Sequence, residues 1–362
     1  MNDGRGAARP ADPARRTTIA DVAALSGTSK GTVSFVLNNK PGVADATRRR
    51  VLSAIEELEW RPSRLARSLS FSRADAIGLV LARTAETLRA DSFFAPFLAG
   101  VEQGVALADM SVLLRFVSSE EIELEAYQSL VRSGRVDGMI VADLRPSDPR
   151  IDLLRELGVP AVSLNRPDVP SPFPAVVNDD VAGIEAAVEH LVGLGHSRIA
   201  QVGGPRRFLH TQRRRTAFSA ALSARGVRSG ATVEADFTAH AAASATRRLL
   251  ESPREVRPTA IMFDNDIMAV AGTVVAQHLG LSVPGDLSVV GFDDVELSAF
   301  VSPPLTTVRT DPFTWGLTAA RQLLALVHGG EDVLDVVLDV PELVVRSSTS
   351  APADRHLDVV GR

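Results

Sequence analysis

The spacing of hydrophobic and polar positions changes near residue 76 and divides the chain into two parts. Before residue 76, apolar positions recur at helical spacing in three short stretches, over 18–26, over 29–37 and after Asp45. Gly27 lies between the first two stretches, where the chain needs a sharp turn. Three short helices around one small core, the first two joined by a Gly-containing turn, indicate a helix-turn-helix.

From Ala76 onward, apolar runs bounded by turns alternate with amphipathic stretches, which predicts parallel sheets with right-handed crossovers. The β-α units are too numerous for one sheet, so we expect two α/β subdomains. The predicted strands are Ile77–Ala82, Val112–Phe116, Gly138–Ala142, Ala161–Leu164, Ala175–Val177, Ile199–Val202, Ala260–Phe263, Leu287–Gly291 and Leu305–Val308. The predicted helices are Phe97–Leu107, Glu123–Arg132, Val181–Leu194, Arg213–Arg225, Ala241–Leu250, Ile267–Leu279 and Pro312–His328.

Composition excludes several classes of protein. The 362 residues are 45% hydrophobic and 23% charged, as in soluble globular proteins. No apolar run reaches the roughly 18 residues that span a bilayer, and the N-terminus has no apolar segment typical of a secretory signal. The absence of cysteine excludes disulfides, thiolate metal sites and cysteine nucleophiles, and it fits a cytoplasmic location.

Charge is distributed unevenly along the chain. Residues 1–73 carry a net charge of +6 and residues 74–362 a net charge of −11. A basic N-terminal part joined to an acidic remainder favours binding of the N-terminal part to an anion such as nucleic acid. An uneven surface charge without such a partner would give the same net charges.

Specific motifs in the head carry a resemblance that continues through the rest of the chain. The head motifs are Ile19–Ala23, Ser29–Asn38, Thr47–Val51 and Arg61–Leu69. Further along they are Phe93-Phe94, Val159-Pro160, Asn165-Arg166, Asp179–Gly183, Gly195-His196, Gly203–Pro205, Asp264–Asp266, Val289–Asp294 and Pro304–Val308. Over residues 17–350 the chain resembles the LacI/GalR family of transcription regulators.

The resemblance implies that the second helix lies in the major groove of operator DNA, with Lys30 and Gly31 at the base edges and Phe35 one turn later. Most relatives carry a side chain at the position of Gly31. Glycine offers none for base discrimination. The resemblance also implies a hinge helix that folds on the operator, with Leu69 as a wedge in the minor groove. The full set of expected DNA-binding residues is Thr18, Ser29, Lys30, Gly31, Thr32, Ser34, Phe35, Asn38, Thr47, Arg64, Ala66, Arg67 and Leu69.

Each of these assignments has a structural alternative. Lys30 can be an ordinary solvated lysine, and Phe35 can be a core side chain instead of a contact to a thymine methyl. Thr18, with Asp21 three residues on, forms a capping-box sequence, so Thr18 and Ser29 can cap helices as well as bind phosphate. Leu69 can pack against the following domain.

Polar residues that follow predicted strands indicate a small-molecule site, because α/β subdomains bind ligands at the carboxyl ends of their strands. The resemblance places Arg214, nine residues after Pro205, at the family's ligand arginine. Carboxylates, an amide and an arginine around an aromatic ring suit a sugar or a similar polyol. The expected effector-binding residues are Phe94, Asn165, Arg166, His210, Arg214, Asp264, Asn265 and Asp293.

Two other functions fit the sequence less well. A periplasmic solute-binding protein shares the sensor fold but has no basic head and needs a signal peptide. An enzyme needs a nucleophile-base pair or a phosphate loop, and the motifs GxxxxGK[ST] and HExxH do not occur. Gly203–Pro205 is too short for a dinucleotide fingerprint, and the seven histidines show no metal spacing, so no cofactor, metal or catalytic residue is expected.

The expected protein is an α/β protein: a small all-α head and hinge helix, then two Rossmann-like, periplasmic-binding-protein-like subdomains. We expect a cytoplasmic homodimeric repressor that binds double-stranded operator DNA and a carbohydrate effector, which acts as an inducer or, as in a minority of relatives, as a corepressor. The expected segments are a disordered tail (1–16), the DNA-binding head (17–60), the hinge (61–73), the sensor (74–350) and a second disordered tail (351–362). Within the sensor, subdomain 1 holds 76–177 and 310–338, and subdomain 2 holds 179–307 and 339–350.

Overall fold

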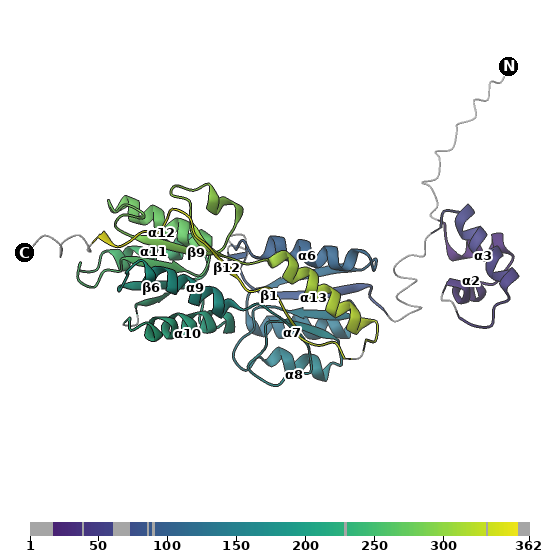
Figure 1. Ribbon diagram of the computed structural model, residues 1–362. Coiled ribbons are helices and arrows are strands. Elements are labelled where there is room, and N and C mark those ends of the chain that lie inside the picture. The colour runs from purple at the N-terminus through teal and green to yellow at the C-terminus, as the bar shows by residue number, and fades with distance from the viewer. Residues whose placement is uncertain are drawn as a thin grey trace, which may run out of the picture. The chain divides into compact units, whose positions relative to one another are not determined.

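The computed structural model describes residues 17–37, 40–60, 73–84, 87–88, 91–227, 230–330 and 332–353 (Figure 1). The chain forms two compact units, Met1–Asp75 and Ala76–Arg362. Each unit is described by itself below. Within the described ranges, no helix is both long and apolar enough to cross a membrane.

The N-terminal unit is a three-helix head composed of α1 (Ile19–Ser26), α2 (Lys30–Leu37) and α3 (Asp45–Glu57). Its small core contains buried valines from all three helices, among them Val22, Val33 and Val51, together with Trp60. The predicted start of α1 is confirmed, because the Thr18 N–H donates to the Asp21 carboxylate at 2.8 Å. Gly27 ends α1 with φ = 62°, a left-handed conformation that glycine adopts without steric cost.

The C-terminal unit contains two sheets of six strands, which we call the first and second lobes. The first lobe has the strand order β11-β5-β4-β3-β1-β2, from β1 (Ala76–Ala82), β2 (Ser111–Val117), β3 (Gly138–Val141), β4 (Ala161–Leu164), β5 (Ala175–Val177) and β11 (Val336–Val337). The second lobe has the order β12-β10-β9-β8-β6-β7, from β6 (Ile199–Gly203), β7 (Thr232–Glu234), β8 (Ala260–Phe263), β9 (Ser288–Asp293), β10 (Thr306–Arg309) and β12 (Glu342–Val344). All pairs are parallel except β10 with β12.

Helices pack on both faces of each sheet, as doubly wound folds require. In the first lobe, α6 (Phe94–Ala106) and α13 (Pro312–Val327) lie side by side on one face (Figure 1), with α7 (Glu120–Arg132) and α8 (Pro149–Glu156) on the other. In the second lobe, α9 (Asp180–Gly193) and α10 (Leu209–Ala224) oppose α11 (Ala239–Leu250) and α12 (Asp266–His278). A short 3₁₀ helix, η1, spans Glu296–Ala299.

The predicted fold class is confirmed, and every predicted strand and helix of the sensor is present. The chain passes between the lobes three times, after β5, after β10 and after β11. Five of the described elements of the sensor were not predicted: the helix α8, the 3₁₀ helix η1 and the short strands β7, β11 and β12. The domain boundaries within the chain remain predictions, and the two tails expected to be disordered fall almost entirely outside the described residues.

Candidate functional site

The head presents an exposed polar face at the start of α2. Ser29 and Lys30 are exposed, and Gly31 leaves the backbone of this turn open, with only the Ser29 hydroxyl near an added Cβ, at 3.6 Å. Ser29 Oγ accepts a hydrogen bond from the Thr32 N–H at 3.0 Å, so Ser29 caps the helix. The cap leaves the lysine ammonium outside the head core, where it can reach a ligand.

Phe35 is not a core residue, so the alternative that it only packs inside the head is wrong. Its side chain is 47% exposed, and the Lys40 ammonium lies 5.5 Å from the ring centroid. Arg48, at the start of α3, donates to the carbonyl oxygens of Val36 and Lys40 and so ties α3 to the end of α2. Thr18 is exposed, and Thr32, Ser34 and Thr47 are half-buried.

Several predicted DNA contacts cannot be placed. Asn38, Arg64, Ala66, Arg67 and Leu69 lie outside the described residues. Their assignment as DNA-binding residues therefore stays a prediction from the sequence.

The C-terminal unit contains a cavity between its lobes, at the carboxyl ends of the strands, with about 680 Å³ of space between its atoms. A cavity at the carboxyl ends of the strands of two α/β lobes is a common place for a small-molecule site. Six of the eight predicted effector-binding residues line it: Asn165, His210, Arg214, Asp264, Asn265 and Asp293. The cavity is also lined by residues not predicted from the sequence, chiefly Arg83, Asp91, Phe93, Asp143, Asp180, Arg213, Phe237 and Trp315.

Arg83 follows β1 and crosses the boundary between the lobes. Its guanidinium forms two hydrogen bonds to Asp143, of 2.6 and 2.8 Å, and an ion pair with Asp91. Burial opposes ionisation of Asp143, but the guanidinium outweighs burial and holds the pKa of that carboxyl below its ordinary value. The guanidinium carbon lies 5.2 and 5.4 Å from the ring centroids of Phe208 and Phe237, which belong to the second lobe.

Arg214 holds the second-lobe side of the cavity. Nε donates to Asp180 at 2.9 Å, and Nη1 donates to the carbonyl oxygen of Asp264 at 3.0 Å. The Asp264 carboxylate accepts from Gln201 Nε2 and from the Gly204 N–H. These contacts fix the arginine and both carboxylates before any ligand arrives.

Phe237 depends on two of its neighbours for its position. A Cβ on Gly204 would lie 2.1 Å from the Phe237 ring, so this glycine serves close packing. Asn265 caps α12 through the Met268 N–H and donates to the carbonyl oxygen of Phe237 at 3.1 Å. His210 stacks between Phe208 and Phe237, with centroid distances of 5.5 and 5.9 Å, and its removal from water lowers its pKa to about 4.

Strained backbone is found at four positions of the lining. Asp143, Asn165, Phe237 and Asp293 have φ values of 52°, 67°, 69° and 108°. Non-glycine residues adopt positive φ rarely, and such strain is often found at binding sites. The surrounding hydrogen bonds keep these side chains aimed at the cavity at a cost to local stability.

Two predicted residues do not line the cavity. Phe94 is only 3% exposed and packs edge-on against Phe93, so Phe93 presents the ring that was expected from its neighbour. Arg166 is largely exposed and pairs with Asp335 at 2.6 Å. Its backbone carbonyl instead accepts from Arg213 Nη2, which joins the two lobes.

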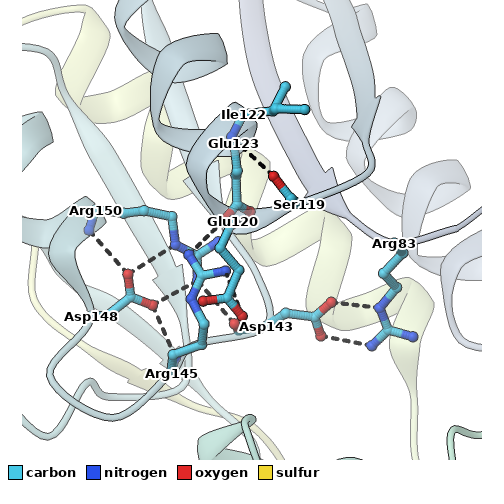
Figure 2. Close-up of polar contacts among 9 residues, drawn as sticks. All are labelled: Arg83, Ser119, Glu120, Ile122, Glu123, Asp143, Arg145, Asp148 and Arg150. Atoms are coloured by element: carbon cyan, nitrogen blue, oxygen red, sulfur yellow. Dashed lines mark hydrogen bonds and ion pairs between the residues drawn. The ribbon is translucent and has the colours of Figure 1, made fainter.

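A buried ionic cluster supports the first-lobe side of the cavity (Figure 2). Arg150 is fully buried and pairs with Glu123 at 2.9 Å and with Asp148 at 2.6 Å. Its Nη2 also donates to the carbonyl oxygen of Asp143 at 2.9 Å. The cluster therefore fixes the strained residue that holds Arg83.

Comparison with known proteins gives consistent matches over nearly the whole chain. Residues 18–63 match the model of bacterial regulatory proteins of the lacI family, and residues 188–349 match a periplasmic binding protein-like domain. The transcriptional regulator MalR of Streptomyces coelicolor is 39% identical over 358 residues, covering 94% of this chain and 98% of the relative. The regulator CelR of Thermobifida fusca is 34% identical over 340 residues, covering 92% and 98%.

Solved structures show the same similarity. A Lac repressor dimer bound to operator and the anti-inducer ONPF has a TM-score of 0.79 at 30% identity, covering 93% of this chain and all of that one. The complex of CelR with cellobiose has a TM-score of 0.70 at 32% identity, covering 92% and 100%. The likeness extends through the head and both lobes.

Proposed function

This chain belongs to the lacI family of bacterial regulatory proteins, and from that premise we propose that it is a cytoplasmic repressor whose binding to specific operator DNA is controlled by a carbohydrate. One observation carries the proposal: the same chain contains a helix-turn-helix, in which Lys30 at the start of α2 is exposed, and a two-lobed unit with a polar cavity. The exposed start of α2 supports major-groove reading. The polar cavity favours a small ligand whose binding modulates binding to DNA.

A carbohydrate effector fits the chemistry of the lining. Carboxylates and amides offer acceptors and donors for hydroxyl groups, while Phe93 and Trp315 offer apolar rings for the C–H face of a sugar. The similar regulator CelR is known in complex with cellobiose. We assign effector contacts to Asn165, His210, Arg214, Asp264, Asn265 and Asp293, and we add Phe93 in place of Phe94.

We also propose a homodimer, because a palindromic operator is matched by a two-fold symmetric protein. The C-terminal unit exposes large apolar side chains that a second copy would cover. Leu107 and Phe116 of the first lobe are 98% and 44% exposed, and Leu297 and Phe300 of the second lobe are 61% and 76% exposed.

The proposed control is a coupling between the lobes and the two DNA-reading heads. Effector binding would shift the arrangement of the first lobes in the dimer and, through residues 61–73, the spacing of the heads. A ligand shifts such an equilibrium only by its differential affinity for the two states, typically about 1–3 kcal/mol, or roughly 5- to 150-fold in affinity. We expect the effector to weaken operator binding.

The test is reciprocity. The operator is first selected from a random duplex pool, and the effector is found by thermal shift with a sugar panel that includes cellobiose and maltose. Effector should lower operator affinity by the same factor by which operator lowers effector affinity, measured by fluorescence anisotropy and calorimetry. Asp293→Ala should remove the response, whereas Asp152→Ala, at an exposed position of α8, should keep it. Unequal factors, or no operator in the pool, would contradict the proposed function.

A further inference from the structure

A second, smaller pocket lies within the second lobe, between β6, β7 and the first half of α10. It has about 210 Å³ of space between its atoms, less than a third of the space in the cavity between the lobes. Asp264 lines both spaces, so the small pocket shares a wall with the proposed effector site. A molecule in this pocket would act on the effector site from behind, without touching the effector.

Two buried polar atoms of this pocket have no hydrogen-bond partner among the described residues. They are Oε1 of Gln201, on β6, and Oγ1 of Thr211, on α10. The two residues are 0% and 2% exposed, so bulk solvent does not supply the missing partners. Polar groups that are removed from water are nearly always hydrogen-bonded, and an unpaired one destabilises the folded protein. The pocket that both residues line is where a shared partner would lie.

The orientation of the Gln201 amide is fixed by its other end. Nε2 donates to one carboxylate oxygen of Asp264 at 2.8 Å, and the Gly204 N–H donates to the other at 3.0 Å. An ionised carboxylate only accepts hydrogen bonds, so turning the amide round would place oxygen against oxygen. Oε1 therefore needs a donor from the pocket. Such a donor also polarises the amide and strengthens its hydrogen bond to Asp264.

The charge of the lining favours a neutral occupant. The lining has two arginines, Arg206 and Arg215, and two acids, Glu234 and Asp264, so its formal charge is zero when all are ionised. Arg206 and Glu234 also pair with each other, at 3.3 Å. Neither an anion nor a cation gains from such a lining as a whole. Water is small, donates and accepts, and commonly makes about three hydrogen bonds where it is buried among polar groups.

We propose that this pocket binds a water molecule that donates a hydrogen bond to Gln201 Oε1 and bridges it to the Thr211 hydroxyl. The bound water fixes the Gln201 amide. Gln201 does not line the effector cavity, and it is thereby a positioning residue that aims the Asp264 carboxylate at the effector. The inference rests on the proposed function in one respect, that Asp264 contacts the effector.

The first measurement needs no effector. Thr211→Val removes the bridged hydroxyl with little change of shape, so it should lower the Tm of the full-length protein by about 2 °C or more. Thr246→Val is the matched control on α11 of the same lobe. The Thr246 hydroxyl is also buried and unpartnered among the described residues, but it does not line the pocket, so its removal should leave the Tm unchanged or raise it. An unchanged or raised Tm for Thr211→Val would overturn the proposal.

The identity of the occupant is tested directly. A high-resolution crystal structure of the full-length protein should show a water within about 3 Å of both Gln201 Oε1 and Thr211 Oγ1. Clear density for both side chains without such a water would overturn the proposal. Ammonium chloride and sodium chloride at equal ionic strength should give the same Tm. A saturable rise with ammonium that Thr211→Val removes would show that the pocket binds a cation instead.

The positioning role is tested with the sugar identified in the panel. Gln201→Met keeps the side-chain length but removes the amide, and it should weaken sugar binding roughly tenfold or more, because a hydrogen bond to a carboxylate is lost. Gln322→Met on α13 is the control. Its buried amide likewise donates through Nε2, to the Leu334 carbonyl oxygen, and has an unpartnered Oε1 among the described residues, but Gln322 lines neither space. It should lower the Tm and leave the sugar affinity unchanged.

Equal sugar affinities for the wild type and Gln201→Met would overturn the positioning role, and an equal loss in Gln322→Met would show that lost stability alone explains the effect. Absence of sugar binding in the wild type would contradict the proposed function alone. The comparison of Thr211→Val with Thr246→Val needs no sugar and still decides whether the pocket holds the bridging water.

Discussion

At the scale of single residues, the cavity is held by side chains that no ligand needs to touch. Arg150 lies behind the cavity wall and acts through the backbone of Asp143, to which it donates a hydrogen bond (Figure 2). A buried guanidinium requires full compensation, because taking a charge out of water costs several kcal/mol. Glu123 and Asp148 provide that compensation with three hydrogen bonds besides the backbone contact.

Replacing Arg150 with Met should therefore destabilise the protein strongly. The change keeps much of the side-chain volume but removes the ion pair of buried Asp148 and one of the two arginine partners of Glu123, which keeps Arg145. We therefore expect a loss of about 3–5 kcal/mol in the free energy of unfolding. Arg155→Met is the control on the same helix, because its pair with Asp152 is more than half exposed and should contribute less than about 1 kcal/mol. Chemical denaturation measures both variants, and equal losses would contradict this account of the cluster.

Another residue-scale prediction concerns Asp266, which is fully buried and lies outside the cavity lining. It accepts hydrogen bonds from Ser298 and Thr307, yet burial still raises its pKa to about 6. Because its pKa is higher in the folded than in the unfolded protein, the stabilisation from protonated Asp266 is fully present below about pH 4 and is lost as the pH rises through about 6. Melting curves from pH 4 to 7 should show this slope in the wild type, and a slope of the same size in Asp266→Asn would contradict the assignment.

At the scale of elements, the close approach of α6 and α13 depends on glycine. A Cβ on Gly100 would lie 2.0 Å from the carbonyl oxygen of Phe313, and a Cβ on Gly316 would lie 2.1 Å from that of Phe97. Neither backbone can move without separating the two helices from the sheet beneath them. These two glycines therefore set the distance between the helices and, with it, the packing of Trp315 at the cavity.

Gly100→Ala should lower the free energy of unfolding by about 1–3 kcal/mol, the usual cost of overpacking a core. Gly193→Ala is the opposite control: it lies at the end of α9, no atom lies within 4 Å of the added Cβ, and alanine favours helix by up to about 1 kcal/mol. Thermal denaturation should therefore move in opposite directions for the two variants. A stabilised Gly100→Ala protein would show that the helices tolerate separation.

The sequence predicts elements well where apolar spacing is regular and poorly where packing alone defines them. The strand β7 has no buried residue and β11 has two residues, so neither leaves an apolar run that could be predicted. The start of α7 was placed at Glu123 instead of Glu120, because its first turn is acidic and capped by Ser119. Helix starts of this kind are decided by caps more than by periodicity.

The same limits apply to the site. Asp264 and Asp293 were predicted because each lies at the end of a buried apolar strand, and the same rule applied to β1 and β3 would have given Arg83 and Asp143. Phe237 follows the unpredicted strand β7, so no sequence signal leads to it. Phe93 was missed in favour of Phe94 because spacing alone does not tell which of two adjacent rings faces the cavity.

At the scale of the whole molecule, opposite charges are separated along one chain. The first 73 residues carry a net charge of +6 and the remainder a net charge of −11. An acidic sensor repels the DNA backbone, so productive encounters are confined to the basic head. Affinity for DNA should therefore depend on salt through the head alone.

We expect the logarithm of operator affinity to fall steeply and linearly with the logarithm of salt concentration, because phosphate contacts release counterions. Lys30→Ala should weaken operator binding more than binding to a random duplex of the same length, if the exposed start of α2, where Lys30 lies, reads base edges as proposed. Fluorescence anisotropy over about 50–200 mM salt measures both effects. Equal losses on the two duplexes would mean that Lys30 meets only phosphate.

The order of strands in the two sheets also bears on how the protein is made. The first lobe receives α13 and its edge strand β11 only after β6 to β10 of the second lobe have left the ribosome. During synthesis, the face of the first sheet that α13 covers stays uncovered while more than a hundred further residues are added, at roughly 5–20 residues per second. The nascent chain therefore exposes part of an apolar sheet face for several seconds, and we expect chaperones to bind this lobe during translation.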